Sequence, residues 1–148
     1  MSKLEFLIDQ IIESRNFVNR LLSDLPQDLW YEIPEHTDSN FAWQLGHLML
    51  SQNFHAITVI SGKNAQVFKM IPPHILKEQF DAVHEICVDN LSKLPEDILE
   101  EGLEPIPIKH PVATTKYEAL SWCFKHEMWQ SAEMEDIKRA LGHPIQWV

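Results

Sequence analysis

Residues 114–142 read TTKYEALSWCFKHEMWQSAEMEDIKRALG, a segment with the features of one long helix. Thr115 and Glu118 have the spacing of a capping box, in which two side chains satisfy free N–H groups at a helix start. No glycine or proline follows until Gly142, a typical residue just past a helix end. The stretch therefore predicts one unbroken helix from about residue 115 to residue 141. Its apolar face consists of Leu120, Cys123, Phe124, Met134, Ile137 and Leu141.

Three more segments have the apolar periodicity of helices, at about residues 3–23, 40–61 and 73–94. Pro26, Gly62 and Pro95 end them, and Asp38 or Ser39 is the expected N-terminal cap of the second. The connectors at residues 26–38, 62–73 and 104–115 are rich in proline, and no segment has a convincing strand pattern. The sequence predicts an all-α protein, a four-helix bundle forming a single domain over residues 1–148.

The predicted second helix is apolar on two sides. One stripe consists of Ala42, Leu45, Met49, Ala56 and Val59. A second stripe, on roughly the opposite side, consists of Trp43, Leu50, Phe54 and Ile57. A helix of this kind is covered on two sides, either by other helices of the bundle or by a second subunit. Because soluble monomers seldom expose a contiguous apolar patch, we expect a homodimer with a two-fold interface.

Charge and composition narrow the classes of partner. The formal net charge of -10, with scattered lysines and arginines, opposes nucleic-acid binding, which requires positive charge. No run of 18 apolar residues predicts a membrane span, and the N-terminal residues do not resemble a signal peptide. Cys87 and Cys123 form no CxxC motif, so we expect free thiols and a cytoplasmic location.

Histidines in two of the predicted helices form a candidate metal site. His126 and Gln130 are four residues apart, which places them on one face of the last helix, one turn apart. His47 lies in the first half of the second helix, and bundle cores build metal sites from facing helices. Three such residues would leave coordination positions open for water or substrate.

Each of these residues also has a plain structural interpretation. His47 can be a partly buried histidine with a hydrogen-bond partner, and His126 with Glu127 can be a surface pair. Cys123 is either a small core residue or a soft metal ligand. The other histidines, which share no common spacing, are expected on the surface: His36, His55, His74, His84, His110 and His143. No nucleophile motif, phosphate-binding glycine loop or HExxH motif is present.

Three short motifs resemble the DinB-like (YfiT-type) superfamily. They are Trp43-x-x-Gly-His47-Leu, the Thr-Thr-x-x-Glu-Ala-Leu start of the last helix, and His126-Glu127 followed by Lys-Arg-x-Leu-Gly near its end. The resemblance covers essentially the whole chain. It implies a bundle of up-down-down-up topology, often dimeric, with a three-histidine site for nickel or zinc. It also implies thiol-dependent transfer or isomerisation with bacillithiol, mycothiol or glutathione.

The resemblance assigns the first two metal ligands to His47 and His126, and the third to Gln130, where the family has histidine. Trp43, Cys123 and Glu127 are expected around this pocket. An amide oxygen is a poorer ligand than imidazole for nickel or zinc, so metal affinity should be lower. Two interpretations remain. The chain is a metal-dependent, thiol-linked transferase or hydrolase with a degenerate His/His/Gln site, or a non-catalytic bundle that has lost its metal. The second would act by binding a small molecule or by dimeric association.

Overall fold

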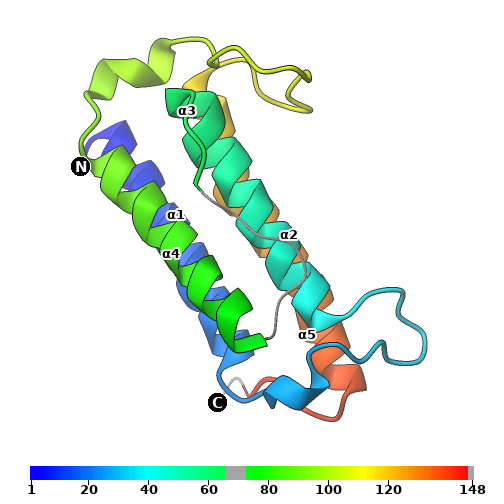
Figure 1. The fold of residues 1–148 in the computed structure, drawn as a ribbon. Helices are drawn as coiled ribbons and strands as arrows, with labels where there is room; N and C mark the ends of the chain where they lie inside the picture. Colours follow the sequence, from blue (N-terminus) through cyan, green and yellow to red (C-terminus); the bar gives the residue numbers. More distant parts are fainter. Residues whose placement is uncertain (66–72, 147–148) are drawn as a thin grey trace.

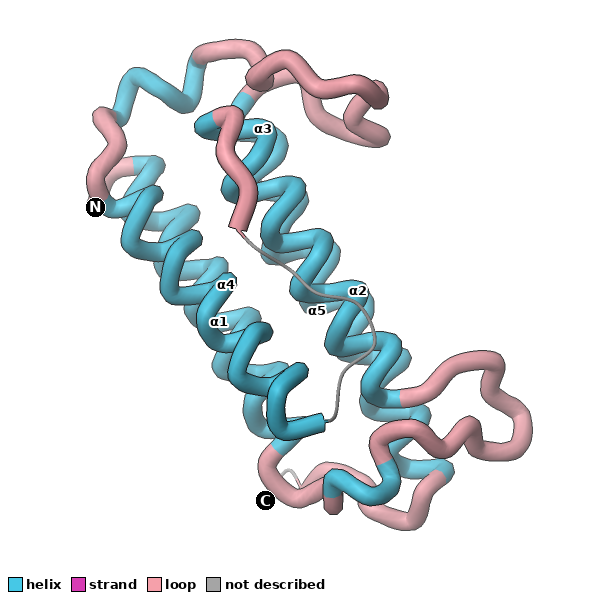
Figure 2. Tube along the Cα trace, viewed as in Figure 1, coloured by secondary structure: helices cyan, strands magenta, loops and turns pink. Residues whose placement is uncertain are grey.

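Four long helices form the body of the protein (Figure 1). The computed structural model describes residues 1–65 and 73–146. The helices are α1 (Lys3–Leu22), α2 (Phe41–Asn53), α4 (Pro73–Ser92) and α5 (Lys116–Ala140). The described part contains no strand, and its loops lie at the two ends of the bundle (Figure 2). The predicted all-α bundle is confirmed.

The chain direction gives the expected topology. Helices α1 and α5 run the same way and pack side by side, and α2 and α4 run the opposite way and pack on each other (Figure 1). Contacts of α2 with α5 and of α1 with α4 close the four-membered arrangement. This is the up-down-down-up order, in which α4 starts at the end of the bundle far from the end of α3 (Val59–Ser61). Residues 66–72 of the expected connector lie outside the described residues.

Helix ends follow local signals, with one correction. Thr115 accepts a hydrogen bond from the Glu118 N–H, and α5 then runs without a break to Ala140, as predicted. Gly62 and Gly142 have left-handed φ values of 71° and 83°, which fit glycine after a helix end. The prediction of Asp38 or Ser39 as the cap of α2 is wrong. Asn40 is the cap, and its Oδ1 accepts from the Trp43 N–H at 2.8 Å.

The predicted second helix is helical throughout but not uniform. After Asn53 the backbone widens into a π turn, η2 (Phe54–Thr58), before the single turn α3. A π turn contains more residues than an α turn, so the residues after it are rotated around the helix relative to an α-helical course. His55 lies within this turn.

Short elements close the ends of the bundle: the 3₁₀ turns η1 (Gln27–Leu29) and η3 (Glu96–Glu100). The loop from Glu101 to Thr115 is tied down at both of its sides. The Glu104 N–H donates to the Val59 carbonyl at 2.9 Å, and Lys116 Nζ bonds Glu101 and Glu104 at 2.7 and 2.9 Å. These contacts hold the start of the loop against α3, and His110 farther along the loop contacts His55 of η2.

The second apolar stripe of the predicted second helix is only partly covered within one chain. Ile57 is buried, and Phe54 packs against the core. Trp43 and Leu50 are instead 57% and 52% exposed. The first stripe is buried as predicted. No helix in the described part of the chain is long and apolar enough to cross a membrane.

Candidate metal centre

His47 from α2 and His126 from α5 meet at their ring nitrogens. Their Nε2 atoms are 3.3 Å apart, and the rings meet edge to face with centroids 5.2 Å apart. The helices bring them together because α2 and α5 run in opposite directions and pack side by side. Two nitrogens bound to one tetrahedral zinc at about 2.0–2.1 Å would themselves be about 3.3 Å apart. In the structure the two nitrogens share a hydrogen bond, so His47 is a half-buried histidine with a hydrogen-bond partner, which confirms that interpretation of the sequence. The same separation is also the one that a shared metal ion would require.

Burial favours the neutral form of both imidazoles, which is the form that binds a metal. Burial lowers the pKa of His47, opposed by the negative charge of Glu133. Burial also lowers the pKa of His126, helped by His47 and opposed by Glu133. His126 is buried, so the predicted alternative of a surface pair with Glu127 is wrong.

Aromatic rings surround the two histidines. Trp43 stacks on His47 with ring centroids 5.1 Å apart and an interplanar angle of 6°. The ring centroids of Trp122 and His126 are 5.9 Å apart, and those of Trp129 and Trp122 are 6.3 Å apart. Trp43 and Trp129 are both more than half exposed. The histidine pair therefore has an apolar, aromatic border that extends to the surface.

Gln130 is half-buried one turn after His126 on α5. Its Oε1 atom is buried and accepts no hydrogen bond within the described residues. A buried acceptor without a donor costs on the order of 1–3 kcal/mol, so this atom calls for a partner. A metal cation is one suitable partner for an amide oxygen. Because Gln130 follows His126 by one helical turn, its amide oxygen is the candidate for a third donor beside the two imidazoles.

The structure does not provide a richer set of ligands. Among the described residues, no group of three or more His, Cys, Asp or Glu side chains is arranged to hold a metal ion.

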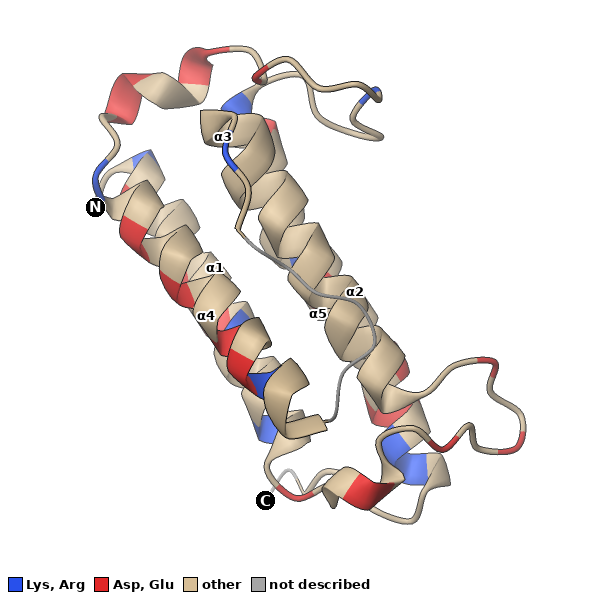
Figure 3. Ribbon diagram, in the orientation of Figure 1, with Lys and Arg blue, Asp and Glu red and all other residues tan. Residues whose placement is uncertain are grey.

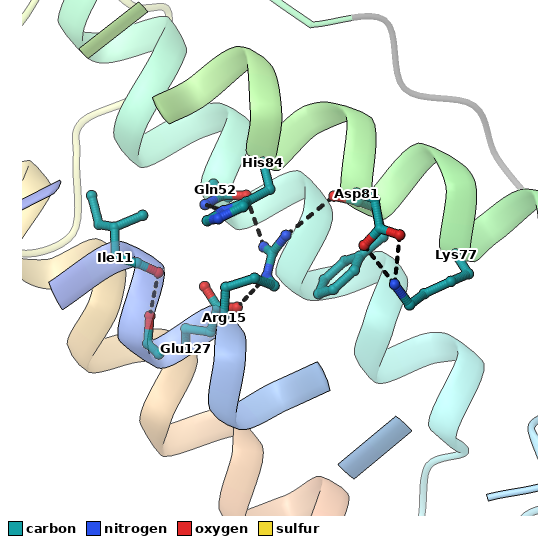
Figure 4. Close-up of polar contacts among 9 residues, drawn as sticks. Ile11, Arg15, Gln52, Lys77, Asp81, His84 and Glu127 are labelled. Atoms are coloured by element: carbon teal, nitrogen blue, oxygen red, sulfur yellow. Dashed lines mark hydrogen bonds and ion pairs between the residues drawn. The ribbon is translucent and has the colours of Figure 1, made fainter. Parts of the chain in front are cut away.

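Glu127 takes part in a buried polar cluster in the bundle interior (Figure 4). Its Oε1 accepts from Arg15 Nε at 2.6 Å, and both side chains are almost fully buried. Burial raises the pKa of Glu127, and the Arg15 cation opposes this. Cys123 is buried nearby, and burial raises the pKa of its thiol well above the usual value. Glu127 is thus engaged with Arg15, and Cys123 stays a protonated thiol.

Two further histidines join the site, and the prediction that they lie on the surface is wrong. His55 and His110 are only 6% and 4% exposed, and His55 Nδ1 lies 2.7 Å from His110 Nε2. The His55 ring is 5.9 Å from the His126 ring. His84, also expected on the surface, is half-buried beside Gln52.

The sequence carried little signal for this second pair. His55 is eight residues after His47, which in a regular α-helix places it roughly 80° around the axis. The π turn alters this relation, and His110 arrives from a distant loop. Only the clustering of histidine and aromatic residues in both segments hinted at a common site.

Comparison with known proteins agrees with the fold. No curated protein matches the chain. The family comparison matches residues 10–129 to the DinB superfamily, a range that includes His47 and His126 and ends one residue before Gln130. The match spans most of the chain, and the four-helix arrangement accords with it. The chain belongs to the DinB superfamily.

Proposed function

We propose that the protein is a metal-dependent, thiol-linked transferase or hydrolase acting on a small molecule. His47 and His126 would hold a divalent ion, nickel or zinc, with the Gln130 carbonyl oxygen as a weak third ligand. The observation that carries the proposal is the 3.3 Å separation of the two Nε2 atoms. The buried and unpaired Oε1 of Gln130 supports it.

The chemistry supplied by the bound ion would be to lower the pKa of a low-molecular-weight thiol, so that its thiolate attacks an electrophile. In such a transfer the sulfur forms a bond to the electrophilic carbon, the leaving group departs with its electron pair, and the thiol proton passes to solvent. Hydrolysis would use water in place of the thiol.

The residues of this chain contribute binding and exclusion of water. Trp43 fixes the His47 ring by stacking, and Trp122 borders His126. Their apolar surfaces lower the local dielectric and can bind an apolar part of a substrate. Glu133, held by Gln44 Nε2 at 3.0 Å, adds a negative charge that favours a cation at the histidine pair.

Homodimerisation remains part of this proposal. Trp43 and Leu50 expose a large apolar area on α2. Figure 3 shows that this helix carries no charged residue, in contrast to α4. In a chain of net charge -10, an uncharged helix is the surface on which two copies can meet with least repulsion.

A thiol titration of nickel-loaded protein tests the function. Glutathione, bacillithiol and mycothiol are added in turn, and absorption is followed for a thiolate-to-nickel charge-transfer band. We expect a saturable band with at least one thiol, its loss in His126→Ala, and its retention in the matched control His84→Ala. Metal binding without a band for any thiol would overturn the thiol-linked part of the proposal. Absence of metal binding would favour the alternative of a non-catalytic bundle. The observation that supports this alternative is that glutamine stands at position 130 in place of the third histidine.

A further inference from the structure

His110 is fixed in one tautomer by the backbone of its own loop. Its Nδ1 atom lies 2.9 Å from the Ala113 nitrogen and 3.2 Å from the Val112 nitrogen, and both backbone N–H groups donate to it. A nitrogen that accepts two N–H bonds carries no hydrogen. An imidazole has at least one N–H group, so His110 is neutral with its hydrogen on Nε2.

That hydrogen determines the tautomer of His55. His110 Nε2–H donates to His55 Nδ1 across 2.7 Å, so Nδ1 of His55 is bare. His55 is therefore also neutral, and its single hydrogen is on Nε2. Burial favours the same state, because it lowers the pKa of His55 to about 3 and also lowers the pKa of His110.

Packing holds this histidine pair rigidly. Phe54 stacks on His110, with ring centroids 5.4 Å apart and an interplanar angle of 10°. The Phe54 ring also meets the His55 ring edge to face, with centroids 5.1 Å apart. His55 is 6% exposed and sits within the π turn. A side chain held on several sides loses little entropy when it binds a ligand.

The Nε2–H group of His55 has no acceptor among the hydrogen bonds of the described residues. The His55 ring lies 5.9 Å from His126, whose Nε2 is 3.3 Å from that of His47. The ring that carries this donor thus lies beside His126, one of the two imidazoles proposed to hold a metal.

We infer that the Nε2–H group of His55 donates a hydrogen bond to the ligand bound at His47 and His126, and that His110 is the residue that positions this donor. The ligand must then offer an accepting atom there: a carboxylate or carbonyl oxygen, or a thiolate sulfur. This inference rests on the proposed function, because it needs a ligand at the histidine pair.

The same geometry excludes His55 as a replacement for the missing third histidine. If His55 coordinated a metal through Nε2, its hydrogen would move to its Nδ1. His110 Nε2 would then have to accept a hydrogen bond from His55 Nδ1–H. His110 would then carry hydrogen on Nδ1, pointing at the two backbone N–H groups of Val112 and Ala113. That arrangement replaces two hydrogen bonds by two contacts between donors.

The tautomers can be read directly from metal-free protein. Long-range ¹H–¹⁵N NMR spectra distinguish protonated from bare ring nitrogens, and the His55→Gln and His110→Gln variants assign the signals. We expect both histidines with hydrogen on Nε2 and bare Nδ1 at pH 7. In His110→Ala, His55 should populate both tautomers. Hydrogen on Nδ1 of His55 in the wild type would overturn the inference, whatever the metal affinity.

Ligand binding tests the role of the donor, with sodium formate as the probe. Formate is titrated into zinc-loaded protein, and its affinity is followed by NMR. One hydrogen bond to a charged acceptor corresponds to about tenfold or more in affinity. His55→Phe should weaken formate binding by that factor and leave the zinc affinity nearly unchanged. His55→Gln keeps an N–H donor, so it should retain most of the wild-type affinity for formate. His84→Phe is the matched control and should alter neither.

Three other results of these titrations would contradict the inference or the proposed function. Equal loss of zinc and formate affinity in folded His55→Phe and His55→Gln would make His55 a metal ligand and overturn the inference. Unchanged formate affinity in both would show that the donor does not face the ligand. If the wild type binds no zinc, the proposed function and the ligand role of His55 fail together, whereas the NMR experiment still decides the tautomers.

Discussion

At the scale of single residues, Gln130 is the position where this chain departs from the three-histidine pattern. It lies one turn after His126, and its buried Oε1 has no donor within the described part. His47 and His126, the other two proposed ligands, already meet at their Nε2 atoms. The low metal affinity expected of the proposed site is therefore due to one ligand, the amide of Gln130.

The substitution Gln130→His should raise the affinity for nickel or zinc by about tenfold or more, on the scale of changes in a metal's surroundings. The physical reason is that an imidazole nitrogen replaces a neutral amide oxygen on the same helix face. Calorimetric titration of the wild type and the variant measures the change. Equal affinities would mean that residue 130 is not where a third ligand belongs.

His84 should contribute to the pH dependence of stability. Burial, assisted by the Arg15 cation, lowers its pKa from 6.5 to about 4. Between these values the unfolded chain binds more protons than the folded one, so this contribution is complete above pH 6.5 and is lost towards pH 4. His84→Gln should flatten the dependence of unfolding free energy on pH in this window, by at most about 1.4 kcal/mol per pH unit. Urea unfolding at several pH values measures it, and parallel curves would contradict the assignment.

At the scale of elements, Arg15 connects all four long helices (Figure 4). From α1 it donates to Glu127 of α5 at 2.6 Å, to Gln52 of α2 at 2.7 Å and to the Phe80 carbonyl of α4 at 3.1 Å. The guanidinium also lies 3.6 Å from the Phe80 ring centroid. This buried cluster sets the relative positions of the helices that carry the histidines.

Removing Arg15 alone should be costly, because it leaves the Glu127 carboxylate buried without its partner. We expect Arg15→Met to lower the free energy of unfolding by about 3–5 kcal/mol. The double variant Arg15→Met with Glu127→Leu should recover part of this loss, since no buried charge remains. Lys93→Met, at the exposed pair with Asp89, is the control and should cost less than about 1 kcal/mol. Chemical unfolding decides, and a double variant no more stable than Arg15→Met would contradict the account.

Local signals made the helices predictable. The Thr115–Glu118 capping box and Gly142 mark the ends of α5 within a few residues of chain, so no tertiary information is needed. The cap of α2 was missed because Asp38, Ser39 and Asn40 are all good caps, and only the folded backbone selects among them.

The second histidine pair was not predictable, because it depends on contacts between distant segments. His110 reaches His55 only after its loop is tied to Val59 and Lys116, and His55 lies in a π turn that no local pattern marked. His47 and His126 could be paired from a resemblance, whereas their distance and burial could not. In the sequence Arg15 interrupts the apolar face of the first helix, and only the folded structure shows that it is the buried link between helices.

At the scale of the whole molecule, the uncharged helix α2 is the surface on which we propose that two copies meet. Trp43 and Leu50 are exposed on it, close to the histidine pair through the stacking of Trp43 on His47. A stable interface needs roughly 1,200 Å² or more of buried area in total. A dimer formed here would also cover part of the aromatic border of the site.

Leu50→Glu should convert the dimer to a monomer, because it places like charges near each other across a two-fold axis. Ile86→Glu on α4, at a position also exposed, is the matched control and should leave the dimer intact. Light scattering at micromolar concentration measures the mass. A wild-type mass near the 17.3 kDa of one chain would contradict dimerisation.

In the proposed function His47 and His126 together hold a divalent metal, and calorimetric titration with zinc measures this binding. The protein is purified without a histidine tag and freed of metal. We predict one zinc site per chain in the wild type, at least about tenfold weaker binding in His47→Ala and in His126→Ala, and unchanged binding in His84→Ala. No saturable binding by the wild type, or equal affinity in all four proteins, would contradict the account.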